Sequence, residues 1–409
     1  MAACFGILFV AYGVQFSYGV FLPAMAAETG WDRTSLSLAF SIYVFVYSVL
    51  GAASGWCTDR FGPRLVIGCG ALLLGGGLLL TSRVDALWQL YLSLGLIAAL
   101  GMSAIYVPCS ATVVRWFTWR RGLALGIASS GHGFGNLLIP PLAALLTAGY
   151  GWRATYALLA LVGAMLILLC ALVMVRDPER MGLHPDGIAP AVASKRAAAQ
   201  RTPNLAPPSA EAIWTLGSAR RTAALWLVTA VFTMTFLVIF LPMVHLVPFA
   251  LDLRISPVRA ALAVSLIGAG SLAGRLLSGA VSDRLGRQWT LGMALSLQAL
   301  AFGGFWASTG ASLLFPSALL FGLATGATST LFPAIVGDFF GRLSVGAIFG
   351  FVWAIAASAA AFGPLIAGYL YDVTGSYADA FALSAALNVA AACLVLFLRK
   401  PGLPKPASD

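Results

Sequence analysis

Twelve long apolar runs constrain the fold of this 409-residue chain more than any other feature. A helix that crosses a lipid bilayer needs about 20 mostly apolar residues, and each run is close to that length. Only 9% of the residues are charged, and the mean hydropathy is +0.92. This composition excludes a soluble enzyme, a nucleic-acid-binding module and a disordered chain. The prediction is an all-α membrane protein with spans near 3–26, 35–57, 65–82, 88–114, 122–147, 154–175, 222–250, 258–281, 289–308, 312–337, 345–371 and 377–398.

The basic residues predict how the chain is oriented in the bilayer. If the N-terminus is cytoplasmic, 18 of the 24 basic residues fall on the cytoplasmic side, five fall in outer loops, and Arg275 lies inside a span. Cytoplasmic loops of membrane proteins carry such an excess of Lys and Arg. We therefore expect both termini in the cytoplasm. The net charge of +10 is explained by orientation, with the lipid bilayer and not nucleic acid as the partner.

The chain repeats itself at an offset of 224 residues. The segment GWCTDRFGPR (55–64) follows the second span, and GAVSDRLGR (279–287) follows the eighth. Three further pairs keep nearly the same offset: Pro108 with Pro333, Pro140 with Pro364, and Gly151 with Gly375. An internal repeat indicates duplicated structural units. We expect a six-helix half at 1–176, a polar linker at 177–221, a second six-helix half at 222–398, and a cytoplasmic tail at 399–409.

The doubled motif and the 6 + 6 arrangement resemble the major facilitator superfamily. The resemblance implies two bundles that rock around a midplane site and expose it alternately on each side. Each motif glycine is expected to let two helices approach closely, and the charges to pair at the cytoplasmic face. The residues expected to serve gating are Asp59, Arg60, Arg64, Asp283, Arg284 and Arg287. No GxxxxGK[ST] phosphate-binding motif is present, so a gradient-driven transporter is predicted, not an enzyme.

The start of the fifth span indicates a resemblance to one family within this superfamily. The segment RWFTWRRGLALG (115–126) is similar to the monocarboxylate transporter signature, in which an aromatic pair precedes two arginines and a glycine-containing run. The alternative is structural, because two arginines at a cytoplasmic helix start also satisfy the positive-inside rule.

Arg275 is the strongest candidate for substrate binding. An arginine inside a span costs about 2.5–3.5 kcal/mol on insertion scales, so it should face a wet cavity and have a partner. Its fork of donors matches a carboxylate. Monocarboxylate transporters and the similar oxalate/formate exchangers carry a substrate-binding arginine in this span, and Arg275 matches that position. The alternative is a structural ion pair, although no Asp or Glu lies in the middle of any span.

This sequence differs from these families in two ways, and the differences affect the expected proton coupling and the expected charge of the substrate. Ser271 stands where animal monocarboxylate transporters have an aspartate one turn before the arginine, and their first-span lysine is missing. Proton coupling by their route is therefore not expected. The second cation of the oxalate/formate exchangers is also absent between Ala347 and Tyr371. A binding site with one cationic side chain is expected to prefer a substrate with a single negative charge.

Further candidates come from spans 1, 4, 5 and 10. Tyr106 is expected to donate a hydrogen bond to a carboxylate or hydroxyl, and Phe332 to form an apolar wall. Asn136 needs a polar partner at depth. Gln15 and Tyr18 in the first span complete the set. Apolar walls around one arginine favour a small monocarboxylate such as L-lactate or pyruvate over a sugar.

Protonatable candidates are few. His245, in HLVPFALD (245–252), can titrate near neutral pH, and with Asp252 it is expected to line the outer half of the pathway and load the proton. This stretch resembles one in bacterial relatives. Alternatively, the imidazole of His245 has hydrogen-bond partners near the outer interface and carries no proton, and Asp252 is a charged residue of an outer gate. His132 is interpreted as a packing or cavity-lining residue, and His184 belongs to the linker.

Together these features predict a monomeric, prokaryotic inner-membrane symporter of a monocarboxylate and a proton, with no cofactor. The six scattered cysteines offer neither a disulfide framework nor a metal site. Three alternatives stay open. The first is an organic-anion exchanger. The second is a drug or metabolite efflux antiporter, although span 5 lacks the Gly-Pro motif typical of that group. The third is a non-transporting sensor, which would need an additional domain.

Overall fold

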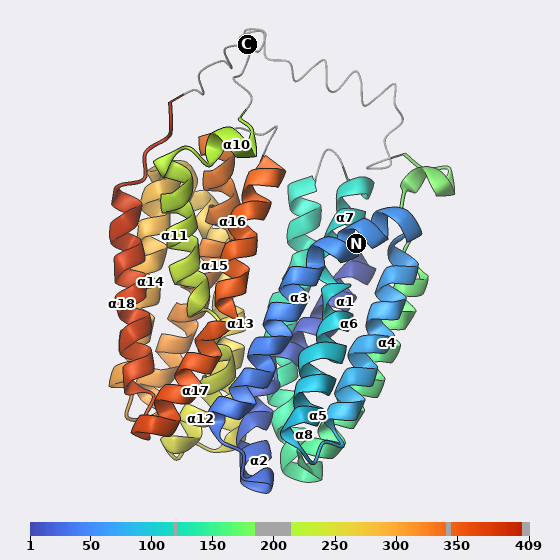
Figure 1. Ribbon diagram of the computed structural model, residues 1–409, viewed down its shortest axis with the longest axis vertical. Coiled ribbons are helices and arrows are strands. Elements are labelled where there is room, and N and C mark those ends of the chain that lie inside the picture. Colours follow the sequence, from blue (N-terminus) through green and yellow to red (C-terminus); the bar gives the residue numbers. More distant parts are fainter. Residues whose placement is uncertain (118–120, 185–213, 341–344, 403–409) are drawn as a thin grey trace.

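The computed structural model describes residues 1–117, 121–184, 214–340 and 345–402, and these residues form helices without a β-strand (Figure 1). The first half contains α1 (Ala2–Phe16), α2 (Tyr18–Thr29), α3 (Arg33–Phe61), α4 (Pro63–Thr81), α5 (Leu87–Leu90), the π-helix η1 (Tyr91–Ala98), α6 (Ala99–Ser103), α7 (Tyr106–Trp116) and α8 (Arg121–Leu172). The short helices η2 (Pro178–Met181) and α10 (Leu216–Ala219) follow. The second half contains α11 (Ala223–Leu237), α12 (Leu241–Asp252), α13 (Pro257–Leu285), α14 (Arg287–Ala307), α15 (Ala311–Phe340), α16 (Val345–Ala360), α17 (Phe362–Thr374) and α18 (Ala378–Leu396).

Helix lengths agree with the predicted spans. Eleven helices in the described ranges are long and apolar enough to cross a membrane, when helices separated by a short break count as one. One of them is α8, whose 52 residues are far too many for a single crossing of a bilayer. Gly151 has non-helical angles (φ 79°, ψ 163°) and divides α8 into two limbs. The two limbs are the predicted fifth and sixth spans.

Several spans are broken one turn before a proline. A proline at position i cannot donate to the carbonyl of residue i−4, so that carbonyl loses its helical partner. The break between α6 and α7 lies at Ala104, four residues before Pro108, and the break between α11 and α12 begins at Val238, four residues before Pro242. These breaks interrupt a span in each half.

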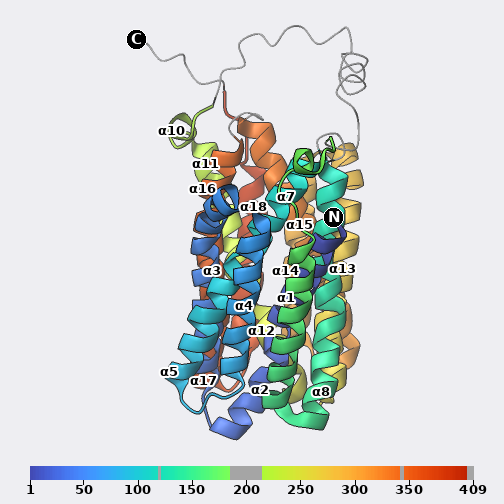
Figure 2. The ribbon, with the colours of Figure 1, turned by 90° about the vertical axis from the view of Figure 1, so that its right-hand side faces the viewer.

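The helices run side by side along the long axis of the molecule (Figures 1 and 2). In the first half α8 packs along α1 and α4, and in the second half α13 packs along α15, which also contacts α14. α10 and the ends of α7 and α18 lie at one end of the molecule, here called the linker end, whereas α2, α5 and α12 lie at the opposite end, called the far end (Figure 1). The two halves meet where α8 contacts α13, α3 contacts α16 and α17, and α2 contacts α12.

The two copies of the duplicated motif share a backbone turn but differ in how their first glycine is packed. Gly62 and Gly286 both turn the chain into the next helix with φ 85°, a conformation open essentially to glycine alone. Gly55 lies close to Val107, so that a Cβ there would sit 3.1 Å from its side chain. Around Gly279 there is open space. The expectation of a close helix approach therefore holds at Gly55 and is wrong at Gly279, because no neighbouring helix reaches that face.

The polar contacts between the two halves gather at the far end. Within the described residues, these contacts join Arg33, Thr34 and Ser37 to side chains of α12, α17 and the start of α18. A weaker contact, Asn136 to the sulfur of Met243 at 3.9 Å, is the other one. The molecule is thus closed at the far end by hydrogen bonds.

Candidate functional site

Arg275 occupies the middle of α13, at a position fixed by close helix packing. Two glycine pairs face each other here, Gly270 and Gly274 on α13 and Gly322 and Gly326 on α15. A Cβ on any of the four would overlap a backbone carbonyl of the opposite helix. Small residues four apart are what allow membrane helices to approach so closely. The backbone next to Arg275 therefore has little freedom to shift.

The side chain of Arg275 faces the first half. Its guanidinium lies within electrostatic range of Tyr106 and Tyr12 and of the imidazole of His132. Tyr12 connects this group, because its ring stacks on His132 with centroids 4.1 Å apart and meets Tyr106 edge-on at 6.4 Å. Residues of α1, α7, α8 and α13 thus surround one point between the halves.

No carboxylate within the described residues pairs with Arg275, and its guanidinium makes no hydrogen bond to them. The neighbouring polar pair, Ser278 on α13 and Thr330 on α15, is satisfied internally at 2.6 Å. A structural ion pair, the alternative for Arg275, is therefore not found among the described side chains. The guanidinium of Arg275, which is always charged and presents a fork of N–H donors, is therefore available to bind an anion.

Tyr106 has the exposure expected of a ligand-binding residue. It is the first residue of α7, directly after the break that Pro108 causes, and 45% of its surface is accessible. Broken helices within membrane proteins are found where the backbone lines a cavity or is buried in protein. The tyrosine therefore presents its hydroxyl near Arg275 without a competing partner among the described residues.

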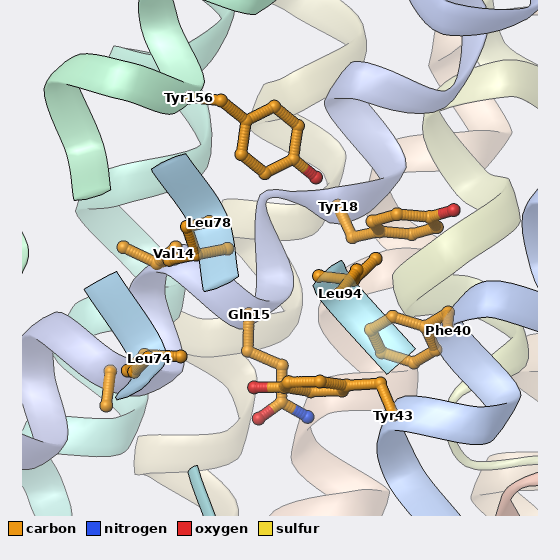
Figure 3. A pocket seen from close by; sticks show the side chains of 10 residues that line it. Val14, Gln15, Tyr18, Phe40, Tyr43, Leu74, Leu78, Leu94 and Tyr156 are labelled. Atoms are coloured by element: carbon orange, nitrogen blue, oxygen red, sulfur yellow. The ribbon is translucent and has the colours of Figure 1, made fainter. Parts of the chain in front are cut away.

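Gln15 and Tyr18 line a small cavity inside the first half together with Phe40, Tyr43 and Tyr156 (Figure 3). Gln15 Nε2 donates to the Tyr47 hydroxyl at 3.5 Å. The hydroxyl of Tyr18 donates to the carbonyl of Leu36 at 2.6 Å, and the buried Gln15 Oε1 has no partner. The cavity has room for about one water molecule.

Asn136 and Phe332 are packed inside the protein. Asn136 is 3% exposed, its Nδ2 contacts the sulfur of Met243, and its Oδ1 has no partner. Phe332 is 2% exposed and lies among Phe232 and Phe236 in the second half. None of these contacts brings Asn136 or Phe332 against Arg275.

Arg33 is the centre of a network at the far end that the sequence reading did not single out. We call this network the latch: Arg33, Thr34, Ser37, His245, Asp252, Asp372 and Tyr377. The Arg33 guanidinium pairs with both oxygens of Asp252 at 3.0 Å, donates to Tyr377 at 2.6 Å, and lies 3.6 Å above the Tyr371 ring. Asp372 accepts from the backbone amides of Arg33 and Thr34. A carboxylate of the second half thus caps the N-terminus of α3, where negative charge is favourable.

His245 belongs to the latch and not to the group around Arg275. Its side chain is 0% exposed, with Nε2 at 2.8 Å from the carbonyl of Pro364 and 3.2 Å from Ser37 Oγ, and Nδ1 at 3.0 Å from Tyr377 Oη. A carbonyl only accepts, so Nε2 carries a proton, and in a neutral imidazole Nδ1 accepts from the tyrosine hydroxyl. Both ring nitrogens therefore have partners inside the closed latch.

The predicted gating residues lie at the linker end and are described only in part. Arg287 pairs with Asp338 of α15 at 2.7 Å, and Arg60 lies 5.5 Å from the rings of Trp56 and Phe61. Arg64 and Arg284 are exposed. The side chains of Asp59 and Asp283 lie outside the described residues, as do those of Arg120 and Arg121. The described residues contain no group of three His, Cys, Asp or Glu suited to hold a metal ion.

One sequence signal points to the latch. Arg33 is the first residue of a long span, and a cation at a helix N-terminus opposes the helix dipole. Such a placement calls for an acidic partner. The identity of that partner, 219 residues away in the chain, depends on how the two halves dock.

Known proteins with similar sequences are membrane transporters. The model of the Major Facilitator Superfamily matches residues 4–269 and 227–409. Monocarboxylate transporter 11 of Homo sapiens is 30% identical over 428 residues, which cover 99% of this chain and 82% of the relative. Monocarboxylate transporter 13 of Rattus norvegicus is 28% identical over 400 residues, with coverage of 95% and 86%.

Solved structures with the same fold are also transporters. The crystal structure of a D-xylose-proton symporter superposes with a TM-score of 0.75 at 15% identity, covering 98% of this chain and 97% of the other. A peptide transporter gives a TM-score of 0.73 at 17% identity, with coverage of 97% and 92%. At such identities the likeness concerns the fold alone. The chain belongs to the major facilitator superfamily and, within it, to the group of the monocarboxylate transporters, so it is a multi-pass membrane transporter and not an enzyme.

Proposed function

We propose that the protein carries a small monocarboxylate, such as L-lactate or pyruvate, together with a proton by alternating access. It would act as a monomer, without a cofactor, in the inner membrane of a prokaryote with both termini in the cytoplasm. Arg275 binds the carboxylate and Tyr106 orients it. The same proposal divides the chain into a six-helix half at 1–176, a linker at 177–221, a second six-helix half at 222–398 and a tail at 399–409.

The observation that carries the proposal is the charged fork of Arg275, left without a carboxylate partner among the described residues between the two halves. A carboxylate from the substrate supplies what the charge needs inside a membrane. Because the site offers one cation, a monoanion neutralises it and a dianion does not. The animal relatives named above as monocarboxylate transporters support the same class of cargo.

The proton part of the proposal rests on the latch. In the open state His245 is expected to take a proton from outside, with Asp252 beside the entry. In the closed latch the positive charge of Arg33, which shares the Tyr377 hydroxyl with His245 Nδ1, disfavours a second positive charge on the imidazole. On this proposal the proton passes inward before the far end closes. Closure and proton movement are in this way tied together.

The test is uptake of labelled L-lactate into proteoliposomes, with and without an inward proton gradient. Uptake stimulated by the gradient in the wild type, and lost in Arg275→Ala, supports a proton-coupled carrier with this site. Arg83→Ala is the matched control, since this exposed arginine makes no ion pair with a described residue. Retained uptake in a folded Arg275→Ala variant overturns the site. Uptake that depends on a counter-anion and not on protons favours an exchanger.

A further inference from the structure

His132 is held by one face of its ring. The residue lies in the first limb of α8, where its imidazole stacks on Tyr12 with an interplanar angle of 5°, and the tilted Phe16 ring lies beside it with its centroid at 5.0 Å. Flat stacking on Tyr12 fixes the plane of the imidazole. The two nitrogens lie at the ring edge and not on the stacked face.

Neither nitrogen of His132 makes a hydrogen bond to a described residue, and the side chain is half-buried. A neutral imidazole has one donor and one acceptor to satisfy. The contrast with His245 is direct, because both nitrogens of that residue are bonded inside the latch. A simple packing residue in a membrane interior would carry no polar edge, since unsatisfied polar groups are costly there.

The contact between α8 and α13 brings His132 to the side of the site that faces Arg275. Gly133 is so close to Leu272 that a Cβ would lie 2.9 Å from that side chain. One turn away, a Cβ on Gly268 would lie 3.0 Å from the carbonyl oxygen of Gly133. His132 directly precedes Gly133, and Arg275 follows Leu272 by one turn, so both side chains flank the same crossing. The imidazole is within electrostatic range of the guanidinium.

We infer that His132, stacked on Tyr12, is the residue that binds the oxygen on the carbon next to the substrate carboxylate and thereby gives this site a preference for L-lactate and pyruvate over propionate. This inference rests on the proposed function and deepens it. Arg275 takes the carboxylate with its fork, and the free ring nitrogen pairs with the adjacent oxygen. An imidazole serves both kinds of cargo, because it donates to a keto oxygen and either donates to or accepts from a hydroxyl.

The inference separates two acids of nearly equal size. L-lactate and propionate differ by one hydroxyl, and a site built to hydrogen-bond a substrate group rejects the analogue that lacks it. One hydrogen bond with a net value near 1.4 kcal/mol corresponds to about a tenfold difference in affinity. We expect L-lactate and pyruvate to compete at least about tenfold better than propionate in the wild type.

The experiment measures inhibition of labelled L-lactate counterflow in proteoliposomes by unlabelled L-lactate, pyruvate and propionate. In His132→Phe the ring still stacks on Tyr12 but has no nitrogen, so the preference for L-lactate over propionate should fall to about threefold or less. His132→Gln retains an amide donor and should recover part of the preference. His184→Phe is the matched control, because His184 lies exposed after η2 and should leave the preference unchanged.

The outcomes separate the two claims. If propionate competes as well as L-lactate in the wild type while Arg275→Ala abolishes counterflow, the proposed function stands and this inference is overturned. An unchanged preference in a folded His132→Phe also overturns it. If no monocarboxylate competes, the proposed function itself fails.

Discussion

Two histidines of this chain experience opposite surroundings, although the same residue type lies within the membrane in both cases. His245 is enclosed by hydrogen bonds to Pro364, Ser37 and Tyr377. His132 has one ring face stacked on Tyr12, and neither of its nitrogens is hydrogen-bonded to a described residue. The first arrangement suits a group that controls a conformational state, and the second suits a group that binds a ligand.

Replacing His245 by Gln tests its role in proton movement. The glutamine amide can still donate to the carbonyl of Pro364, so the latch should form, but the side chain cannot carry a proton. We expect lactate uptake to lose its stimulation by a proton gradient. Counterflow of L-lactate at equal pH on both sides should persist, because exchange needs no net proton movement. Full gradient stimulation in this variant would exclude His245 from the coupling.

Some of the candidate functional residues could be predicted from the sequence, and others could not. Arg275 could be found because a charge inside an apolar run is conspicuous and costly. Tyr106 was noticed because Pro108 marks a break in the same span, and its role in binding stays a prediction. Tyr12 and Arg33 were missed. Aromatic residues are common in spans, and Arg33 counted only as an outer-loop charge. Their partners lie in other helices, which a linear pattern does not reveal.

At the scale of helices, α13 and α15 interlock through four glycines. The pattern Gly-x-x-x-Gly occurs once in each helix, at 270–274 and 322–326, and the glycines of one helix lie against backbone carbonyls of the other. Without a hydrophobic effect between helices in lipid, such close packing is a main source of stability. Because Arg275 adjoins one of these glycines, the same packing positions the binding site.

Gly274→Ala should therefore destabilise the second half. The new Cβ would overlap the carbonyl of Leu323 and push α13 from α15. Overpacking of this kind costs about 1–3 kcal/mol, so the midpoint of thermal unfolding in detergent should fall by several degrees. Gly303→Ala on α14 is the control, since no atom lies within 4 Å of a Cβ there. Equal midpoints for both variants would contradict the packing argument.

Helices were the level at which the sequence was most informative. Apolar runs of about 20 residues gave the twelve spans, and proline positions mark most of the breaks within them. The turn at Gly151, which divides α8, was also implied by the gap between two predicted runs. The tight approach at Gly55 and the open space at Gly279 could not be distinguished, because both glycines occupy the same motif position and differ only in what packs beside them.

At the scale of the whole molecule, hydrogen bonds and ion pairs between the halves gather at one end. The latch joins α3 of the first half to α12, α17 and the start of α18 in the second. For the described residues, this distribution corresponds to one of the two end states of an alternating-access cycle. A small number of polar bonds then sets the balance between those states.

Arg33→Gln should shift this balance toward the state that is open at the far end. The change leaves Asp252 unpaired and weakens the bond to Tyr377. Hydrogen bonds to charged groups contribute about 1.5–3 kcal/mol, so the open state should gain at least about tenfold in population. Hydrogen–deuterium exchange should increase for amides at the start of α3 and the end of α12. Arg83→Gln, which removes an exposed charge outside the latch, should leave these rates unaltered. Unchanged exchange in Arg33→Gln would mean that the latch does not determine closure.

The paired turns at Gly62 and Gly286 carry a record of ancestry. Two copies of a duplicated gene begin identical, so a feature present in both is inherited, and one present in a single copy has since been gained or lost. The glycine-only turn is shared by both copies, whereas the close contact of Gly55 with Val107 has no counterpart at Gly279. The reversal of the chain was thus present before the duplication, whereas the packing around it has changed in one copy since then. The two halves descend from one unit, yet they have diverged into partners that need not contribute equally to the motion.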